Sequence, residues 1–336
     1  MRILLIDVGS TNIKYKLYKE DTVKSIPFPL PIINENSLYE VNPAKIIDII
    51  KGIIEEEKPT DVYFSVQMHG YVLLNGGVEV TNYISWRDRR GENIKPSFVI
   101  NSEYGVNIKP NLPRLSIETQ KVVFDEFMTL GSYISYKLTG NNASHISDIT
   151  PTGFFNMIKM KYDFEPFKLP KVEKEAKIVG TYKGINIYTP MGDHQLSIFG
   201  ANTDLFDGYI LNLGTACQIC MVYDNYISGI FETRPYFDNK YLLTITGLPG
   251  GGYIKSKEVS KELEDELVLS YKDAIEKLPK RNQIKAIGGL LNSRKELIEN
   301  VLKRIGIDYF LSNECDALIA LEYVVEGEIK WQKKLD

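Results

Sequence analysis

The sequence is poor in cysteine and has neither a long apolar run nor a block of charge of one sign. Its three cysteines (Cys217, Cys220 and Cys315) are too few for a disulfide framework, which indicates a reducing compartment. No apolar stretch approaches the ~20 residues of a membrane-spanning helix, and Asp7 interrupts the first apolar run too early for a signal peptide. We therefore expect a cytoplasmic protein with no membrane partner.

The charge balance excludes another class of partner. Lysine and arginine total 40 and aspartate and glutamate total 44, so the net charge is −4 at pH 7, and the two signs are mixed along the chain. Nothing in this balance favours a nucleic-acid partner. With 336 residues and 43% hydrophobic content, the chain can bury a substantial core, and its length predicts two domains.

The most informative feature is an internal repeat of residues 6–18 (IDVGSTNIKYKLY) in residues 211–223 (LNLGTACQICMVY). Both copies read as an apolar strand, a Gly-Ser/Thr turn and a second strand that ends in tyrosine. Any two hairpins can look alike over so short a stretch, but the equal placement of the turn favours a duplication. An alignment without a gap places Ile219 at the position of Lys14. Two similar lobes that face each other across a cleft explain this spacing better than a solenoid.

Periodicity predicts further elements around these hairpins. An isoleucine stripe with Asn42 as N-cap and Pro43 at the first position predicts a helix that begins at residue 43. We also expect a strand over 22–28, a strand over 61–66, a helix over 125–138 closed by Gly140, a charged amphipathic segment over 257–278, a strand over 284–287, and helices over 293–305 and 315–326. The domain boundary is expected near residue 190.

A Gly-Ser/Thr turn between strands has a chemical use. It presents backbone N–H groups and hydroxyls that can hold phosphate oxygens, and glycine lets the backbone approach the anion closely. In the first copy, Asp7 suits hydrated Mg²⁺ and Lys14 suits phosphate charge. A single Asp-x-Gly-Ser tetrad is more often an ordinary β-turn, but two copies at equivalent places are more specific.

Several stretches, in chain order, carry a resemblance to a known family: 7–14 (DVGSTNIK), 65–70 (SVQMHG), 86–90 (WRDRR), 148–153 (DITPTG), 191–195 (MGDHQ), 213–215 (LGT) and 287–289 (IGG). The first, 7–14, resembles the first phosphate motif of the FGGY carbohydrate kinases, and 65–70 resembles their sugar-binding stretch. The stretches 86–90 and 148–153 are similar to the family's Trp-x-Asp-Gly-Arg and Asp-x-x-Gly-Thr-Gly regions. The last three resemble, in order, the element with the catalytic aspartate, the second phosphate motif and the start of the adenosine motif. The similarity is greatest to the xylulokinase and sedoheptulokinase branch, and 233–237 (TRPYF) looks most like the latter.

The resemblance implies an α/β, actin-like ATPase (ribonuclease H-like) fold: two lobes, each with a mixed β-sheet flanked by helices, and a ligand cleft between them. Residues 1–190 would be the sugar-binding lobe with the first phosphate hairpin. Residues 191–336 would be a shortened nucleotide-binding lobe. The implied reaction is ATP-dependent phosphorylation of a small sugar, a ketose such as xylulose or sedoheptulose, with Mg²⁺. A homodimer is a candidate assembly.

The same resemblance assigns roles to residues. Asp193 would be the catalytic base, and Asp7 would hold the metal. Nucleotide binding is expected of Gly9, Ser10, Thr11, Asn12, Lys14, Gly214, Thr215, Gly288 and Gly289. Sugar binding is expected of Gln67, Met68, His69, Trp86, Asp88, Arg90, Asp193 and His194.

Each main assignment has a structural alternative. A carboxylate within reach of a sugar hydroxyl can take its proton, but Asp193 also precedes an apolar run and could be a helix N-cap. His69 could be a core histidine, and Trp86 could be a core aromatic residue.

The sequence also departs from the family pattern. Leu290 stands where a third glycine is usual, Arg89 replaces the glycine of Trp-x-Asp-Gly-Arg, and the segment between 252 and 284 is short. Two alternatives to the kinase therefore stay open. One is a sugar-binding pseudokinase or regulatory protein, and the other is an actin-like ATPase that activates another enzyme.

Overall fold

The computed structural model describes residues 2–99, 102–201, 206–214, 216–312 and 317–327. The strands of its first large sheet are β1 (Ile3–Val8), β2 (Asn12–Leu17), β3 (Lys24–Pro27), β6 (Asp61–Val66), β15 (Ile178–Tyr182), β16 (Ile185–Tyr188) and β17 (Met191–Gly192). Their order is β15-β16-β6-β1-β2-β3, and β17 also pairs with β6. β1 pairs antiparallel with β2, as expected from the hairpin that contains residues 6–18, and parallel with β6, which is the strand expected over 61–66.

The second large sheet repeats this arrangement. Its strands are β18 (Tyr209–Leu213), β19 (Cys217–Tyr223), β20 (Glu232–Pro235), β21 (Tyr241–Leu248), β22 (Gln283–Ile287) and β23 (Asp308–Ser312), in the order β20-β21-β19-β18-β22-β23. β18 pairs antiparallel with β19 and parallel with β22, as β1 does with β2 and β6. The path β21-β19-β18-β22-β23 therefore matches β3-β2-β1-β6-β16, which confirms the two-lobed fold.

The gapless alignment of the two hairpins is wrong by one residue. Val8 pairs with Ile13 across the first turn, whereas the equivalent Leu213 pairs with Cys217, so the second turn is one residue shorter. The partner of Asp7 is Lys14, and the partner of Asn212 is Gln218. Gln218 is therefore the structural counterpart of Lys14, and the expected counterpart, Ile219, is not.

The helices lie outside and between the two sheets. They are α1 (Pro43–Glu57), α2 (Pro113–Ser116), α3 (Leu130–Thr139), α4 (Ile146–Ile149), α5 (Asp193–Gly200), α6 (Gly251–Lys255), α7 (Lys261–Glu276), α8 (Leu291–Ile305) and α9 (Ala317–Val325). Short 3-10 turns occur at Ser102–Tyr104, Ile117–Thr119, Thr150–Thr152 and Phe237–Asn239. Among the described residues, no helix is long and apolar enough to cross a membrane.

Smaller strands complete the first lobe. A smaller sheet of this lobe contains β4 (Ile33–Glu35), β5 (Leu38–Val41), β7 (Tyr71–Asn75), β8 (Val78–Glu79), β9 (Tyr83–Ile84) and β10 (Glu126–Thr129). Its order is β10-β7-β9-β5-β4, and β8 pairs with β7. Two short pairs join β11 (Ala143–His145) to β14 (Lys171–Glu173) and β12 (Phe155–Asn156) to β13 (Lys161–Tyr162).

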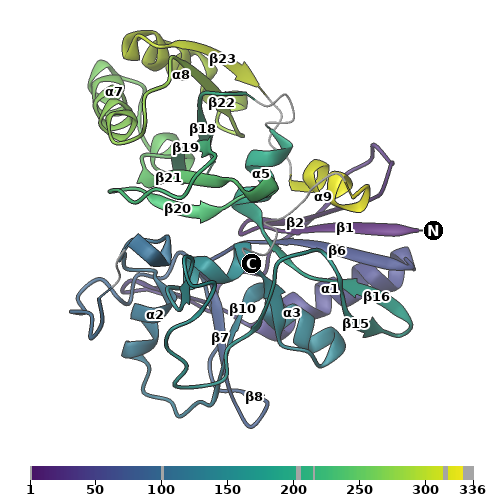
Figure 1. Ribbon diagram of the computed structural model, residues 1–336. Helices are drawn as coiled ribbons and strands as arrows, with labels where there is room; N and C mark the ends of the chain where they lie inside the picture. The colour runs from purple at the N-terminus through teal and green to yellow at the C-terminus, as the bar shows by residue number, and fades with distance from the viewer. Residues whose placement is uncertain (1, 100–101, 202–205, 215, 313–316, 328–336) are drawn as a thin grey trace.

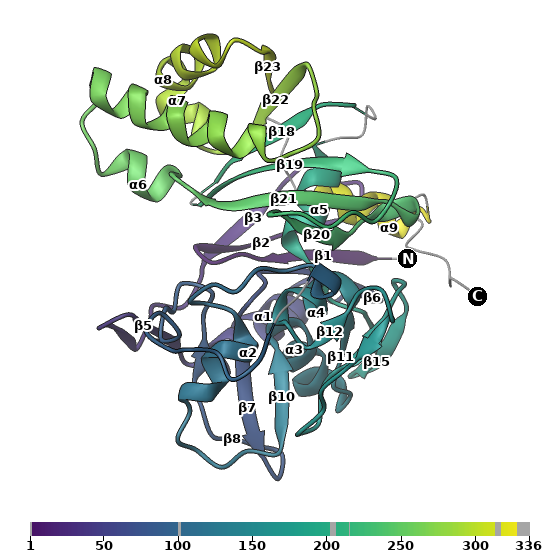
Figure 2. The same ribbon diagram turned by 60° about the vertical axis from the view of Figure 1, so that its left-hand side comes forward.

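The layering follows from the alternation of side chains along β1. Successive residues of a strand point to opposite faces, and both faces of β1 are apolar. Leu4 and Ile6 belong to the core with α1 and α3, whereas Ile3 and Leu5 belong to the core with α5 and α9. Because that second core also takes in residues of β18 and β22, α5 and α9 lie between the two sheets, with α7 and α8 beyond the second sheet (Figures 1 and 2).

Most expected elements are confirmed. The start of one helix is wrong, and the last helix packs on the first lobe. The Asn42 side chain caps α1 by accepting a hydrogen bond from the Ala44 N–H at 2.9 Å. The helix expected over 125–138 is wrong at its start, because residues 126–129 form β10 and α3 begins only at Leu130. α9 packs against β1 and β6 of the first lobe, and an ion pair of 2.9 Å between Lys16 and Glu322 links it to β2.

The end of β22 lies against the end of β18. Gly288 follows β22 with a φ of +108°, and a Cβ added there would lie 2.8 Å from the Leu213 carbonyl carbon. Gly289 has neither constraint, because a Cβ there would meet nothing within 4 Å. The close approach of these two strand ends therefore requires a glycine at position 288 only.

We predict that Gly288→Ala destabilises the protein by roughly 1–3 kcal/mol, because alanine is strained at this φ and meets the Leu213 backbone. Gly289→Ala is the matched control and should change the free energy of unfolding by less than about 1 kcal/mol. Urea denaturation measures both. Equal stabilities of the two variants would show that the strand ends are not this close.

Candidate active site

A cavity of about 850 Å³ lies between the two lobes. The first lobe contributes Gln67 after β6, and the second lobe contributes Gln218 on β19 and Thr246 on β21. Seven of the residues predicted from the sequence line it: Ser10, Gln67, Met68, His69, Trp86, Asp193 and His194. The cavity therefore brings together side chains that are far apart in the sequence and come from both lobes.

The first phosphate turn lies at the edge of this cavity and is bound to the end of β6. The Ser65 hydroxyl donates to the Asp7 carboxylate at 2.8 Å, and the Gln67 side-chain amide donates to the Gly9 carbonyl oxygen at 3.3 Å. A Cβ at Gly9 would lie 3.0 Å from the Asn12 carbonyl oxygen, so the turn is tight. These contacts hold the turn in place before any ligand binds.

Residues around this turn are available to a phosphate and its metal. Lys14 is exposed and pairs in register with Asp7, so both side chains lie on the same face of the hairpin. Thr11 is exposed and Asn12 is half-buried. Among the described residues, no group of three or more His, Cys, Asp or Glu side chains could hold a metal. Asp7 fits Mg²⁺ nonetheless, since that ion commonly takes one or two carboxylates, substrate phosphates and water.

The second phosphate turn meets two other glycine loops. The Gly251 N–H donates to the Gly214 carbonyl oxygen at 2.8 Å, and Gly288 lies against Leu213, the residue before Gly214. The predicted Thr215 lies outside the described residues. Gly214, Gly288 and Gly289 do not line the cavity, which reaches this junction at Gly250. Three glycine-containing segments therefore meet beside the cavity.

Asp193 is positioned by the parallel pairing of β17 with β6. Gly192 pairs with Val66, so Asp193 and Gln67 follow at the same sheet edge. The N-cap of α5 is Gly192, and Asp193 is the first helical residue, so the N-cap interpretation of Asp193 is wrong. Burial and, to a smaller extent, the Asp7 carboxylate together raise the pKa of Asp193 to about 8, although the Arg234 guanidinium opposes both.

Two histidines and a glutamine provide polar atoms that have no partner. His69 adopts a left-handed conformation, with φ of +65°, that is uncommon for residues other than glycine. Burial, with help from Lys109 and Arg234, lowers the pKa of His69 and of His194 well below the usual value, so both rings are neutral. Within the described chain, His69 Nδ1, His194 Nδ1 and Gln67 Oε1 are buried without a hydrogen-bond partner. Such atoms beside a cavity indicate a polar ligand.

Sequence reasoning missed a charged cluster under the cavity. Lys109 of the first lobe contacts Glu232 of β20 at 2.8 Å, and Arg234 contacts the other Glu232 oxygen through Nη2 at 2.5 Å and Nε at 3.0 Å. Burial alone would raise the pKa of Glu232, but the two cations hold it well below its usual value. Arg234 falls in the quoted stretch 233–237, whereas nothing in the local sequence distinguishes Lys109.

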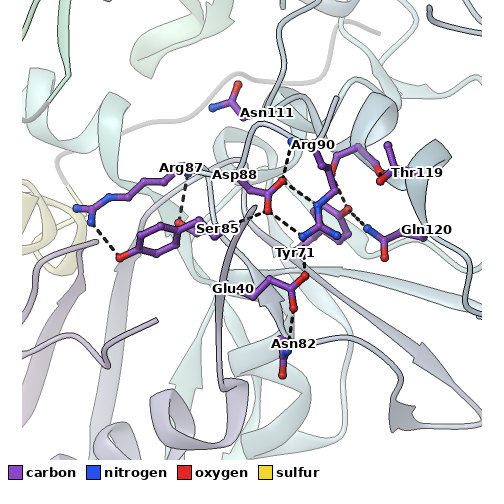
Figure 3. Close-up of polar contacts among 12 residues, drawn as sticks. Glu40, Tyr71, Asn82, Ser85, Arg87, Asp88, Arg90, Asn111, Thr119 and Gln120 are labelled. Atoms are coloured by element: carbon purple, nitrogen blue, oxygen red, sulfur yellow. Dashed lines mark hydrogen bonds and ion pairs between the residues drawn. The ribbon is translucent and has the colours of Figure 1, made fainter. Parts of the chain in front are cut away.

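Asp88 and Arg90 do not line the cavity but form a polar cluster with Glu40. Figure 3 shows this cluster. Arg90 Nε donates to Asp88 at 2.8 Å, and Arg90 Nη2 donates to Glu40 at 2.6 Å. Asp88 is buried and also accepts a bond from the Tyr39 N–H at 2.8 Å. In this structure the pair shapes the loop that follows Trp86, and the wall residues of that loop are Trp86, Arg87 and Arg89.

We predict that Glu232→Gln destabilises the protein by about 3–5 kcal/mol, because it leaves the buried Arg234 and the half-buried Lys109 without a carboxylate. Glu92→Gln, which removes an exposed partner of Arg89, is the control and should cost less than about 1 kcal/mol. The pKa of Glu232 is lowered on folding, so its contribution is present at neutral pH and is lost as pH falls below about 4.3, the ordinary value for glutamate. A stability difference that does not shrink in acid, measured by denaturation, would contradict this account.

Comparison with known proteins gives a clear result for structures only. No protein-family model and no curated protein matches the chain. Among solved structures, it is similar to xylulose kinase from Lactobacillus acidophilus, with a TM-score of 0.80 and 18% identity over 99% of this chain and 93% of that chain. It is also similar to gluconate kinase from Lactobacillus acidophilus, with a TM-score of 0.79 and 17% identity over the same shares of each chain.

A third similar structure contains a nucleotide. This is glycerol kinase from Plasmodium falciparum with ADP, at a TM-score of 0.73 and 14% identity over 96% of this chain and 88% of that chain. At these identities the likeness is one of fold. The chain therefore has the two-lobed, actin-like ATPase fold of these carbohydrate kinases.

Proposed function

We propose that the protein transfers the γ-phosphate of ATP to a hydroxyl of a small sugar, most specifically a ketose such as xylulose or sedoheptulose, in the cytoplasm. The observation that carries the proposal is the place of Asp193. This carboxyl begins α5 inside the cavity that Ser10 of the first phosphate turn also lines, and its raised pKa suits a general base.

The residues support a division of labour between the lobes. We infer that residues 1–190 bind the sugar and that most of 191–336 binds the nucleotide, although α9 packs on the first lobe. Gln67, His69 and His194 offer unpaired polar atoms to sugar hydroxyls, and Trp86 offers a flat apolar surface. Gly214 and Gly288 would approach the nucleotide through their backbones.

The chemistry follows from this placement. The sugar hydroxyl oxygen attacks the γ-phosphorus while its proton passes to the Asp193 carboxylate. The bond from the γ-phosphorus to the bridging oxygen breaks, and ADP leaves with the electron pair. Mg²⁺, when bound with the nucleotide near Asp7, neutralises phosphate charge. Ser10 and Lys14 would hold the phosphate, and the neutral His69 and His194 would orient the sugar without competing for the proton.

We predict that Asp193→Asn abolishes sugar-dependent ADP release. The sugar affinity should stay within about threefold of the wild type, and the free energy of unfolding should stay within about 1 kcal/mol. A coupled ADP-release assay over a panel of ketoses, aldonates and polyols identifies the substrate and then measures the variant. Asp273→Asn, on the exposed face of α7, is the matched control and should keep full activity. Turnover by Asp193→Asn above about one tenth of the wild-type rate would remove Asp193 from this role.

Calorimetry distinguishes the kinase from the pseudokinase. Binding of sugar without binding of MgATP or MgADP would favour the pseudokinase, because a kinase must bind both substrates.

We also predict a pH dependence. The pKa of Asp193 is raised to about 8, and the base must be ionised to accept a proton, so kcat/KM for the sugar should rise about tenfold per pH unit below that value and level off above it. The pKa values of His69 and His194 are shifted by burial in the opposite direction, well below the usual histidine value, so the two rings titrate at lower pH than Asp193. Initial rates between pH 5 and 9 at limiting sugar measure the profile. A flat profile would show that Asp193 is already ionised at low pH.

A further inference from the structure

Arg87 has an unusual position at the first phosphate turn. Its Nη2 group donates to the hydroxyls of Ser10 at 3.3 Å and Thr11 at 3.4 Å, although the turn lies 76 positions earlier in the chain. Its Nη1 group donates to the Tyr39 hydroxyl at 3.1 Å. The guanidinium carbon lies 5.3 Å from the centre of the Tyr39 ring and 5.6 Å from that of Trp86. Two rings and three hydroxyls therefore hold this cation at the cavity wall.

Arg87 differs from the two arginines that follow it in the charge of its partners. Within the described ranges, no aspartate or glutamate forms an ion pair with it, whereas the next two arginines are paired, Arg89 with Glu92 and Arg90 with Asp88. Its protein partners are neutral hydroxyls, which accept hydrogen bonds without offsetting the charge. A guanidinium carries five N–H donors in a planar fork that matches phosphate oxygens. An anion is the ligand that this group lacks.

The neighbouring loop holds Arg87 in this direction. Asp88 accepts bonds from the N–H groups of Tyr39 and Arg90 and from the Arg90 side chain, so both of its oxygens are engaged. Arg87 and Arg90 consequently extend from the loop in opposite directions, Arg90 into the first lobe and Arg87 toward the phosphate turn (Figure 3). The guanidinium is therefore placed before any ligand binds, which lowers the entropy cost of contacting an anion.

We propose that Arg87 binds the terminal phosphate of a nucleoside triphosphate while this group is transferred to the acceptor. Arg87 contacts the phosphate from the acceptor side of the cleft. This inference rests on the proposed kinase function. The contact with Ser10 and Thr11 places the cation where the γ-phosphate would lie, and charge spreads over the equatorial phosphoryl oxygens in the transition state. Arg87 remains protonated throughout and stabilises that charge, while the proton of the sugar hydroxyl goes to Asp193.

The variants Arg87→Ala and Arg87→Lys test this in the full-length protein with MgATP and the sugar that the panel identifies. We expect Arg87→Ala to lower kcat by about 10³-fold, as loss of an arginine that contacts a transferring phosphoryl group does, with sugar Kd and the unfolding midpoint unchanged. Guanidinium at millimolar concentration should restore part of the kcat of Arg87→Ala. Arg87→Lys should retain more activity than Arg87→Ala. Arg304→Ala, which removes a surface cation on α8, is the control.

A merely structural role would lower stability, and a sugar-binding role would raise sugar Kd along with the loss of kcat. A loss of stability, a raised sugar Kd or an unchanged kcat would each overturn the proposal. So would a lowered unfolding midpoint together with a lack of rescue by guanidinium.

A second measurement separates this inference from the kinase proposal. Inorganic phosphate is titrated by calorimetry into the wild type and Arg87→Ala, each saturated with MgADP. We expect at least tenfold weaker phosphate binding by the variant. If the wild type phosphorylates no sugar of the panel but shows this difference, the kinase proposal fails and the anion site stands. Equal phosphate affinity of the two proteins, or no phosphate binding by the wild type, would overturn the anion site.

Discussion

The parallel pairing of β1, β6 and β17 is the constraint on which the site depends. Parallel strands end at one edge of a sheet, so Gly9, Gln67 and Asp193 meet although they lie far apart in the sequence. β18 and β22 repeat the arrangement in the second lobe and bring Gly288 against Leu213, the residue before Gly214. Because the two sheets face each other across α5 and α9, both edges border the same interlobe region.

Burial of charge shapes this region as much as strand pairing does. Burial raises the pKa of Asp193, and the charge of the Asp7 carboxylate adds to this effect. Lys109 and Arg234 share the carboxylate of Glu232, which joins a loop of the first lobe to a strand of the second. Arg87 differs from Lys109 and Arg234 because its partners are hydroxyls and aromatic rings. The cavity wall thus combines a carboxyl suited to accept a proton with a cation suited to an anion.

The sequence predicts the parts that depend on local pattern. The isoleucine stripe predicts α1, apolar runs predict β6 and β22, and the short motifs place Gln67, His69 and Asp193 at one cavity. It cannot predict parts that depend on tertiary pairing. Three neighbouring positions illustrate this, because Asp88 and Arg90 form a buried pair whereas Arg87 reaches the phosphate turn. Lys109 pairs with Glu232 of β20, which lies far away in the sequence, so the local sequence does not indicate this contact. Gln218 replaces the expected Ile219 because one turn is a residue shorter.

Whether one interlobe cavity holds both substrates can be seen in a crystal structure with Mg²⁺, a non-hydrolysable ATP analogue and the sugar from the substrate panel. We expect a sugar hydroxyl within hydrogen-bond distance of the Asp193 carboxylate and a terminal phosphate at Ser10 and Arg87. A sugar bound outside this cavity, or a nucleotide whose terminal phosphate lies away from the first turn, would contradict it.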